Sequence, residues 1–323
     1  MGYLIEKIAD IDNLYDAFRK ASRGKQGKEE VRRYGECLDD NVSLLRQQIL
    51  SGDVRVGHYR YFTIYDPKER IICAADFNER VLHHAIMNVC MSYFDRSLID
   101  TTYATRKGKG IYAALDKAVW GFSKYRYSLK LDFRKYYDSI CHDVLKKLLR
   151  RKFKDGGLLL IFDKIIDSYN ASLGKGLPIG NLTSQYFANA YLSPLDHYVK
   201  EQLKAPVYIR YMDDMLLAGD SQADLKKIFE LLNDYATNRL QLTLKPPVYR
   251  RTNDGQVFLG YKVKPYRYEL SGRSKKRFRS KMMKYGKRLD SGEWEDWVYA
   301  EHVIPLTAFV CHAVSWKFRK TCM

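Results

Sequence analysis

Three aspartates interrupt apolar runs of this sequence, and they limit what the chain can fold into. Asp132 lies near the end of a strongly apolar run at residues 127–133, and Asp213 and Asp214 separate two short apolar runs. Half-buried carboxylates are costly unless a cation offsets their charge. Neighbouring strand residues face opposite ways, but a tight hairpin turn can bring both carboxylates to one place. The pattern therefore indicates either a plain turn or a site built around cations.

The charge balance predicts a polyanionic partner. Lysine and arginine outnumber aspartate and glutamate by 56 to 38, a net charge of +18. Nucleic acid is favoured over a membrane surface, because no stretch approaches the roughly 20 apolar residues of a spanning helix and no secretion signal follows Met1. A soluble, cytoplasmic protein is expected. The six cysteines lack zinc-site spacing. In a protein that binds nucleic acid, paired Mg²⁺ ions are the expected cations for the carboxylates.

Periodicity along the chain predicts an α+β fold without repeats or long linkers. Strands are expected at residues 58–65, 71–75, 127–133, 207–211, 215–218 and 257–263. Helices are expected within residues 5–50, at 78–94, in a segment ending near 122, and at 141–153, 158–169, 184–203 and 224–240. The neighbouring His83 and His84 would face different ways on a helix, so we assign them packing or surface roles.

The segment Tyr211-Met212-Asp213-Asp214 resembles the YMDD box of reverse transcriptases, and Asp132 stands upstream at the matching strand end. The resemblance covers about residues 50–265 and keeps the order of the family's parts. These are Arg70 and Arg80 in a fingers-like hairpin, Asp132, Leu177-Pro178-Ile179-Gly180, the aspartate pair, Lys245 and Leu259-Gly260-Tyr261. It implies a right-hand polymerase with N-terminal helices and fingers at 1–125, a palm at 126–265 with interleaved fingers elements, and a small basic helical thumb at 266–323.

The resemblance also implies a two-metal nucleotidyl transfer. Asp132 and Asp213 would hold two Mg²⁺ ions, with Mn²⁺ able to substitute, and Asp214 would support the site. Phe133, which follows Asp132, is counted with the metal site. A plain turn remains the alternative for the adjacent aspartates.

Further residues match nucleotide-binding positions of the family. Tyr137 matches the steric gate that rejects a 2′-hydroxyl and favours dNTPs, unless it simply packs in the core. Lys245 matches a lysine near the triphosphate that donates a proton to pyrophosphate. The remaining positions are Ile179 and Gly180 beside the incoming nucleotide, and the triphosphate-gripping cations Lys68, Arg70 and Arg80, whose alternative is solvated surface charge.

Nucleic-acid contacts are expected at several places in the chain. Leu259-Gly260-Tyr261 resembles the turn that supports the primer end, with a strand kink as the alternative. Residues 273–288 carry nine basic and no acidic side chains, and would follow the phosphates of a template–primer duplex. The predicted contacts are Arg106, Lys107 and Lys109 on template backbone, and Gln185, Gly260, Tyr261, Lys275, Lys276, Arg277 and Arg279.

The segment 176–185, Gly-Leu-Pro-Ile-Gly-Asn-Leu-Thr-Ser-Gln, resembles reverse transcriptases of diversity-generating retroelements from bacteria and phages. That resemblance implies error-prone copying of a template-repeat RNA at adenines into cDNA, with a small basic accessory protein as partner. An aliphatic Ile179 where many family members have glutamine removes hydrogen bonds and should loosen nucleotide positioning, unless Ile179 only packs. About 60 residues follow Tyr261, too few for an RNase H domain beside a thumb, and no endonuclease is expected either. The alternatives are a group II intron-like, retron or phage-defence reverse transcriptase, or an RNA-binding scaffold.

Overall fold

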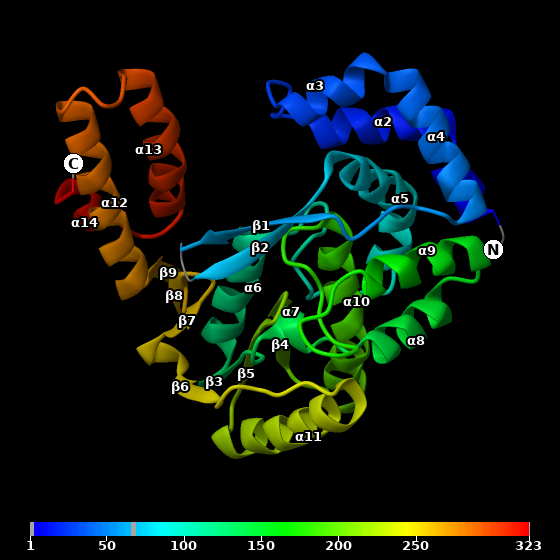
Figure 1. Ribbon diagram of the computed structural model, residues 1–323. Coiled ribbons are helices and arrows are strands. Elements are labelled where there is room, and N and C mark those ends of the chain that lie inside the picture. Colours follow the sequence, from blue (N-terminus) through cyan, green and yellow to red (C-terminus); the bar gives the residue numbers. More distant parts are fainter. Residues whose placement is uncertain (1–2, 66–68, 323) are drawn as a thin grey trace. The chain divides into compact units, whose positions relative to one another are not determined.

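The computed structural model describes residues 3–65 and 69–322, which form two compact units interleaved along the chain (Figure 1). The first unit comprises Met1–Asp100, Phe133–Tyr198 and Leu232–Thr243. The second unit comprises Thr101–Asp132, Val199–Leu231 and Leu244–Met323. The α+β prediction is confirmed, and the functional division into fingers, palm and thumb at 125/126 and 265/266 stays a prediction.

The first unit is mainly helical. Its helices are α1 (Leu4–Ile8), α2 (Ile11–Ser22), α3 (Glu29–Glu36), α4 (Leu38–Ser51), α5 (Phe77–Asp95), α7 (Tyr136–Ser139), α8 (His142–Lys152), α9 (Gly156–Asp167) and α10 (Leu182–His197). Aspartates 10, 76 and 155 start α2, α5 and α9, since each side chain accepts a hydrogen bond from a first-turn amide. Both α2 and α10 pack against α5, which is central to this unit.

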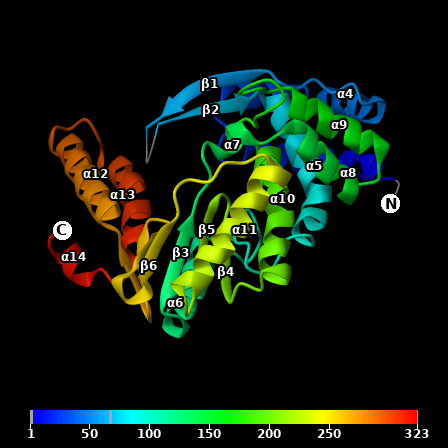
Figure 2. The same cartoon turned by 90° about the horizontal axis from the view of Figure 1, so that it is seen from below.

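A two-stranded antiparallel hairpin completes the first unit. Strand β1 (Tyr59–Ile64) pairs with β2 (Arg70–Ala75), with Tyr59 opposite Ala75 and Ile64 opposite Arg70. Figure 2 shows the two strands side by side, extending away from the helices of the same unit. The backbone amide of Cys73 donates to the carbonyl of Ile179 at 2.8 Å, so the loop before α10 is fixed to the hairpin.

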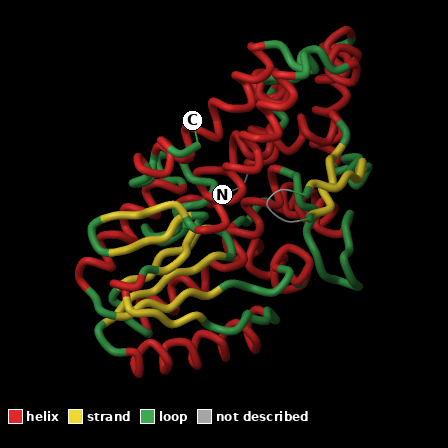
Figure 3. The backbone as a smooth tube through the Cα atoms, turned by 90° about the vertical axis from the view of Figure 1, so that its left-hand side faces the viewer, coloured by secondary structure: helices red, strands yellow, loops and turns green. Residues whose placement is uncertain are grey.

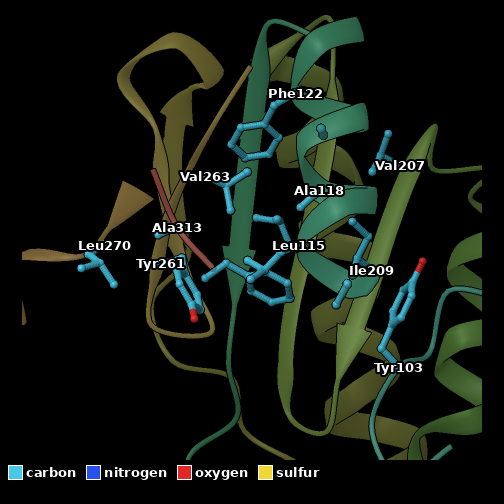
Figure 4. Packing of buried hydrophobic residues seen from close by; sticks show 14 of the residues in the cluster. Tyr103, Leu115, Ala118, Phe122, Val207, Ile209, Tyr261, Val263, Leu270 and Ala313 are labelled. Carbon is cyan, nitrogen blue, oxygen red and sulfur yellow. The ribbon is translucent and has the colours of Figure 1, made fainter. Parts of the chain in front are cut away.

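The second unit is built on a four-stranded antiparallel sheet of order β4-β5-β3-β6, one of the sheets drawn in yellow in Figure 3. Its strands are β3 (Tyr127–Leu131), β4 (Val207–Tyr211), β5 (Asp214–Gly219) and β6 (Val248–Arg251). The helix α6 (Ile111–Lys124) packs on one face, where Val207, Ile209 and Leu115 join a buried apolar cluster (Figure 4). Alternation along the strands therefore turns every second side chain of β4 toward α6.

Helix α6 approaches β4 closely because Gly121 has no side chain. A Cβ atom there would lie 2.9 Å from Cγ1 of Val207, well inside van der Waals contact. The sheet that presents Asp132 and Asp213 is thus held from behind by a tightly packed helix.

The strand predicted at residues 257–263 is wrong as one continuous element. It is a hairpin of β7 (Gln256–Phe258) and β8 (Tyr261–Lys264), and β9 (Arg267–Leu270) adds a third antiparallel strand. Leu259 and Gly260 both have positive φ, 49° and 87°, and such a pair reverses the chain in a two-residue turn.

Helices end the second unit. They are α12 (Gly272–Asp290), α13 (Asp296–Cys311) and α14 (Trp316–Lys320).

Two elements cross between the units: α11 (Gln222–Leu240) and a π-helical turn at Tyr198–Gln202, which replaces the end of the α-helix predicted at 184–203. Among the described residues, no helix combines the length and apolarity needed to cross a membrane.

Candidate active site

The turn between β4 and β5 carries the adjacent aspartates. Tyr211 pairs with Asp214 across the two strands, so Met212 and Asp213 form the reversal. Met212 has a φ of 54°, in the left-handed region that methionine rarely adopts. This backbone lets Asp213 and Asp214 leave the turn in directions that a regular strand would not allow. The expected hairpin at the aspartate pair is therefore present.

Asp132 follows β3 directly and lies at the same end of the sheet as the turn between β4 and β5. Leu131 pairs with Met215 of β5, so the end of β3 is next to the start of β5. Burial raises the pKa of Asp213, and the nearby charge of Asp132 raises this pKa further. A carboxyl group whose ionisation is opposed by burial and by a neighbouring carboxylate is well placed to bind a cation.

Two lysines pair with carboxylates of the site. Lys245 donates from Nζ to Oδ2 of Asp132 at 2.6 Å, and its backbone amide donates to the Asp132 carbonyl at 2.8 Å. Lys130 Nζ lies 3.4 Å from Oδ1 of Asp214. Burial raises the pKa of Asp214 to about 7, although Lys130 opposes this rise. Asp132 and Asp213 therefore interact with each other, while Asp214 is directed to Lys130.

The carboxylates fit a hard divalent cation by their chemistry. Oδ1 of Asp132 is buried and accepts no hydrogen bond from the described part of the chain, whereas Oδ1 of Asp214 lies beside Lys130. Carboxylate oxygens are the ligands that Mg²⁺ prefers, usually one or two from the protein with water and phosphate oxygens completing the shell. Within residues 3–65 and 69–322, no three histidine, cysteine, aspartate or glutamate side chains form a ready metal cage. A two-carboxylate site that needs further ligands agrees with both observations.

Comparison with known proteins identifies the family. A family model described as reverse transcriptase (RNA-dependent DNA polymerase) matches residues 66–263, more than half of the chain. The chain belongs to the reverse transcriptase family. The prediction of an RNA-directed DNA polymerase is thereby confirmed, and the three aspartates lie inside the matched segment.

Curated relatives of this reverse transcriptase are distant. Protein YkfC of Escherichia coli is 22% identical over 268 residues, which cover 67% of this chain and 70% of YkfC. The COX1/OXI3 intron 1 protein of Saccharomyces cerevisiae is 21% identical, with 80% of this chain matching 39% of the yeast protein. The intron 2 protein of the same yeast gene is also 21% identical, over 83% of this chain and 40% of that protein. The chain therefore spans well under half of these intron proteins.

A solved telomerase structure shares the fold. The telomerase of Candida tropicalis truncated from its C-terminal domain superposes with a TM-score of 0.51 at 13% identity, covering 66% of this chain and 55% of the telomerase chain. At this identity the similarity concerns the fold alone. It supports a polymerase fold for this reverse transcriptase.

The structure gathers several predicted nucleotide-binding residues within the first unit. The amide of Leu177 donates to the carbonyl of Tyr137 at 2.9 Å, and Ile179 is bonded to β2 as described above. Gly180 has a φ of 124°, and a Cβ atom there would lie 2.8 Å from Cγ2 of Ile72. Tyr137, Ile179 and Gly180 therefore form one local arrangement beside the hairpin. Their contact with nucleotide stays a prediction.

The two predicted triphosphate-gripping cations that the structure describes, Arg70 and Arg80, lie on different elements. Arg70 starts β2 and is exposed, whereas Lys68 lies outside the described residues. The placement of Arg80 in the hairpin is wrong. Arg80 lies on α5, pairs with Glu30, and stacks over the ring of Phe77 at 5.2 Å with 19% of its side chain exposed. Its helical position follows from the Asp76 cap, which starts α5 four residues earlier.

The predicted nucleic-acid contacts divide between surface and core. Arg106 donates to the carbonyl of Thr102, Lys109 lies over the ring of Tyr103, and Lys107 is exposed. Tyr261 is fully buried and donates to the Phe309 carbonyl, whereas Gly260 beside it is half-buried. The remaining predicted residues are exposed or half-buried: Gln185 on α10, and Lys275, Lys276, Arg277 and Arg279 on α12.

Two residues near the carboxylates escaped the sequence prediction. Lys130 pairs with Asp214, and the guanidinium of Arg210 donates to the Met212 carbonyl at 3.0 Å. Both are cations inside otherwise apolar strands, the same signal that identified the aspartates. The two histidines, to which the sequence assigned packing or surface roles, lie on α5: His83 is buried with Nε2 3.4 Å from Oε1 of Glu79, and His84 is half-buried.

Proposed function

We propose that this reverse transcriptase extends a primer with deoxynucleotides on an RNA template at the Asp132–Asp213 carboxylate pair. The observation that carries the proposal is this pair itself, two neighbouring carboxyl groups at one end of the sheet within the segment matched by the reverse transcriptase family model. Asp214, paired with Lys130, supports the turn that presents Asp213.

Asp132 and Asp213 would hold Mg²⁺, with Mn²⁺ able to substitute, because these two carboxyl groups are adjacent and no residue that the structure describes donates a hydrogen bond to Oδ1 of Asp132. Bound ions would supply activation of the primer 3′-hydroxyl and charge neutralisation at the leaving oxygens. A phenylalanine side chain has no donor atom, so any contribution from Phe133 would come from its backbone carbonyl. Lys245, whose Nζ lies 2.6 Å from Oδ2 of Asp132, is proposed to donate a proton to the departing pyrophosphate or to stabilise its negative charge.

Nucleotide selection is proposed to involve the local arrangement of Tyr137, Ile179 and Gly180. The loop 176–180 is held by backbone bonds from the hairpin and from the segment around α7, so these residues have a defined mutual position. A positioned ring at Tyr137 would exclude a 2′-hydroxyl and favour dNTPs. Arg70, exposed on the hairpin, would contribute phosphate contact.

Duplex binding is proposed for the basic face of α12. An open surface hollow of about 590 Å³ lies on this helix and is lined by Lys276, Arg279, Ser280, Met283, Lys284, Lys287 and Arg288. These residues recur at the three- and four-residue spacing of one helix face. Five cations on one face fit a phosphate backbone, and binding of this kind falls steeply with salt.

We further propose error-prone copying of a template-repeat RNA, as in diversity-generating retroelements, with a small basic accessory protein. The support is the segment 176–185 with Ile179 where many family members have glutamine. The second candidate is an intron-type reverse transcriptase, which the yeast intron relatives favour. The two differ in fidelity at template adenines, and in whether an adenine-variable repeat pair lies near the gene.

Primer extension tests the polymerase proposal. Wild-type protein with Mg²⁺ is given an RNA or DNA template, with dNTPs or rNTPs, with and without candidate accessory protein and cognate RNA. The expected result is dNTP addition on RNA by wild type and its loss in Asp213→Asn. Failure of the wild type in every combination would instead favour an RNA-binding scaffold.

Sequencing of the cDNA tests the error-prone proposal. Wild type should misincorporate chiefly opposite adenine, and Ile179→Gln should lower that error rate. An unchanged error spectrum in Ile179→Gln would show that Ile179 only packs. Uniformly accurate copying by the wild type would favour the intron-type candidate.

A further inference from the structure

Arg210 is an arginine with no exposed surface, in the strand that leads into the aspartate turn. Val207 and Ile209 of β4 face the apolar cluster under α6, so Arg210 lies on the opposite face of the sheet. A buried cation in an otherwise apolar strand is costly unless its donors are used in defined bonds. One such bond runs from Nη1 to the carbonyl oxygen of Met212, two residues further along, at 3.0 Å.

The bond matters because of the backbone that it holds. Met212 has a φ of 54°, a conformation that costs a residue with a Cβ roughly 1–2 kcal/mol and persists only when neighbours enforce it. The peptide that follows Met212 leads directly to Asp213. Fixing the Met212 carbonyl therefore fixes the direction in which the Asp213 side chain leaves the turn.

The segment Thr101–Arg106 secures Arg210 and Met212 from the side. The amide of Arg210 donates to the Thr101 carbonyl at 3.0 Å, and the Arg210 carbonyl accepts from the Tyr103 amide at 2.9 Å. Thr105 of the same segment reaches the sulfur of Met212, with Oγ1 4.0 Å from Sδ. The segment Thr101–Arg106 therefore holds the turn through backbone hydrogen bonds to Arg210 and through a side-chain contact with Met212.

From this geometry we infer that Arg210 is a positioning residue that locks the Met212 turn and thereby holds Asp213 against Asp132. Arg210 does not touch the reacting atoms. The inference rests on the proposed function, because it assigns Arg210 a role in the reaction at the Asp132–Asp213 pair. It predicts that loss of the guanidinium misplaces the Asp213 carboxylate without removing any group that binds RNA or nucleotide.

The test compares Arg210→Lys and Arg210→Met with Ile209→Val. Ile209 is the neighbouring residue of the same strand, is fully buried, and faces the opposite side, so it controls for general weakening of β4. Single-nucleotide addition on an RNA template gives kcat and KM for dNTP, and RNA affinity is measured separately. Hydrogen–deuterium exchange of a peptide covering residues 211–215 reports the turn without depending on activity.

We expect kcat to fall on the order of 10²-fold in Arg210→Met, the scale of a 1 Å misplacement, with KM and RNA affinity within about threefold of wild type. Arg210→Lys retains a donor and should lose less. Exchange at 211–215 should quicken in both variants and stay slow in Ile209→Val. Wild-type kcat in both arginine variants, or equal losses in Ile209→Val, would overturn the inference.

A double variant keeps the inference testable if Arg210→Met folds poorly. Asparagine adopts left-handed backbone more readily than methionine, so Met212→Asn should restore part of the kcat lost in Arg210→Lys. An absence of any restoration would count against a role in holding this turn. If instead the wild type is inactive, or Asp213→Asn retains activity, the proposed function fails rather than the role of Arg210.

Discussion

Replacing Lys245 separates two roles that the structure allows for this residue. Lys245 Nζ is 2.6 Å from Oδ2 of Asp132, so it can act as a fixed positive charge beside the carboxylate pair. It can also donate a proton to pyrophosphate as that group leaves. Lys245→Arg keeps the charge but cannot give up a proton at neutral pH, whereas Lys245→Met removes both functions.

The structure sets the size of the purely electrostatic effect. Opposite charges at this separation attract by several kcal/mol at an effective dielectric of about 20. The side chains of Lys245 and Asp132 remain 40% and 30% exposed, so solvent reduces the net effect to about 1–2 kcal/mol, roughly 5- to 30-fold in rate. General acid catalysis would add about 10²- to 10⁴-fold.

Single-turnover addition of one dNTP, measured by rapid quench, distinguishes the roles. If Lys245 donates a proton, Lys245→Arg and Lys245→Met should both lose at least about 10²-fold in rate. A Lys245→Arg rate within about tenfold of wild type would refute proton donation and leave only the charge. Wild-type rates in both variants would refute any contribution from this ion pair.

Three further predictions concern packing, pH and salt. Gly121→Ala should lower the free energy of unfolding by about 1–2 kcal/mol through its clash with Val207, and Val207→Ala should remove that penalty in a urea-denaturation cycle. Burial lowers the pKa of His84 to about 4, so the unfolded chain takes up its proton first as pH falls below 6.5. Stability should therefore drop by on the order of 1 kcal/mol between pH 6.5 and 4, after allowance for the partial exposure of His84, and His84→Gln should flatten this slope. Lys276→Ala with Arg279→Ala should reduce the slope of log affinity against log salt for duplex by about 1–2, and an unchanged slope would exclude these cations from the interface.

The sequence predicted the strand ends and the turn because local chemistry fixes them. Aspartates that interrupt apolar strands indicate a turn or a site, and the pairing of Leu131 with Met215 brings Asp132 beside the turn. The hairpin and the helix that follows it were likewise predictable, since Asp76 is a plain helix cap. The Asp76 cap also explains why Arg80 lies on α5 and not in the hairpin to which the family resemblance assigned it.

Long-range pairing was not predictable from local pattern. The bond from Lys245 to Asp132 joins residues 113 positions apart, and neither residue carries a signal of the other. Arg210 and Lys130 interrupt apolar strands as the aspartates do, but only the assembled sheet shows that Arg210 is fully buried and that Lys130 pairs with Asp214. The expectation of one strand over residues 257–263 overlooked the reversal at Leu259-Gly260, which only the family resemblance indicated, because sequence preferences disfavour a leucine at positive φ.

The central claim is that Asp132 and Asp213 form the catalytic pair, and single-nucleotide addition on an RNA template tests it most directly. Asp132→Asn and Asp213→Asn are compared with Asp254→Asn, an exposed aspartate of the same unit. The first two should lose at least about 10³-fold in rate, since several kcal/mol of charge stabilisation depend on them, while RNA affinity is kept. Asp254→Asn should match the wild type. A wild-type rate in either Asp132→Asn or Asp213→Asn would contradict the account.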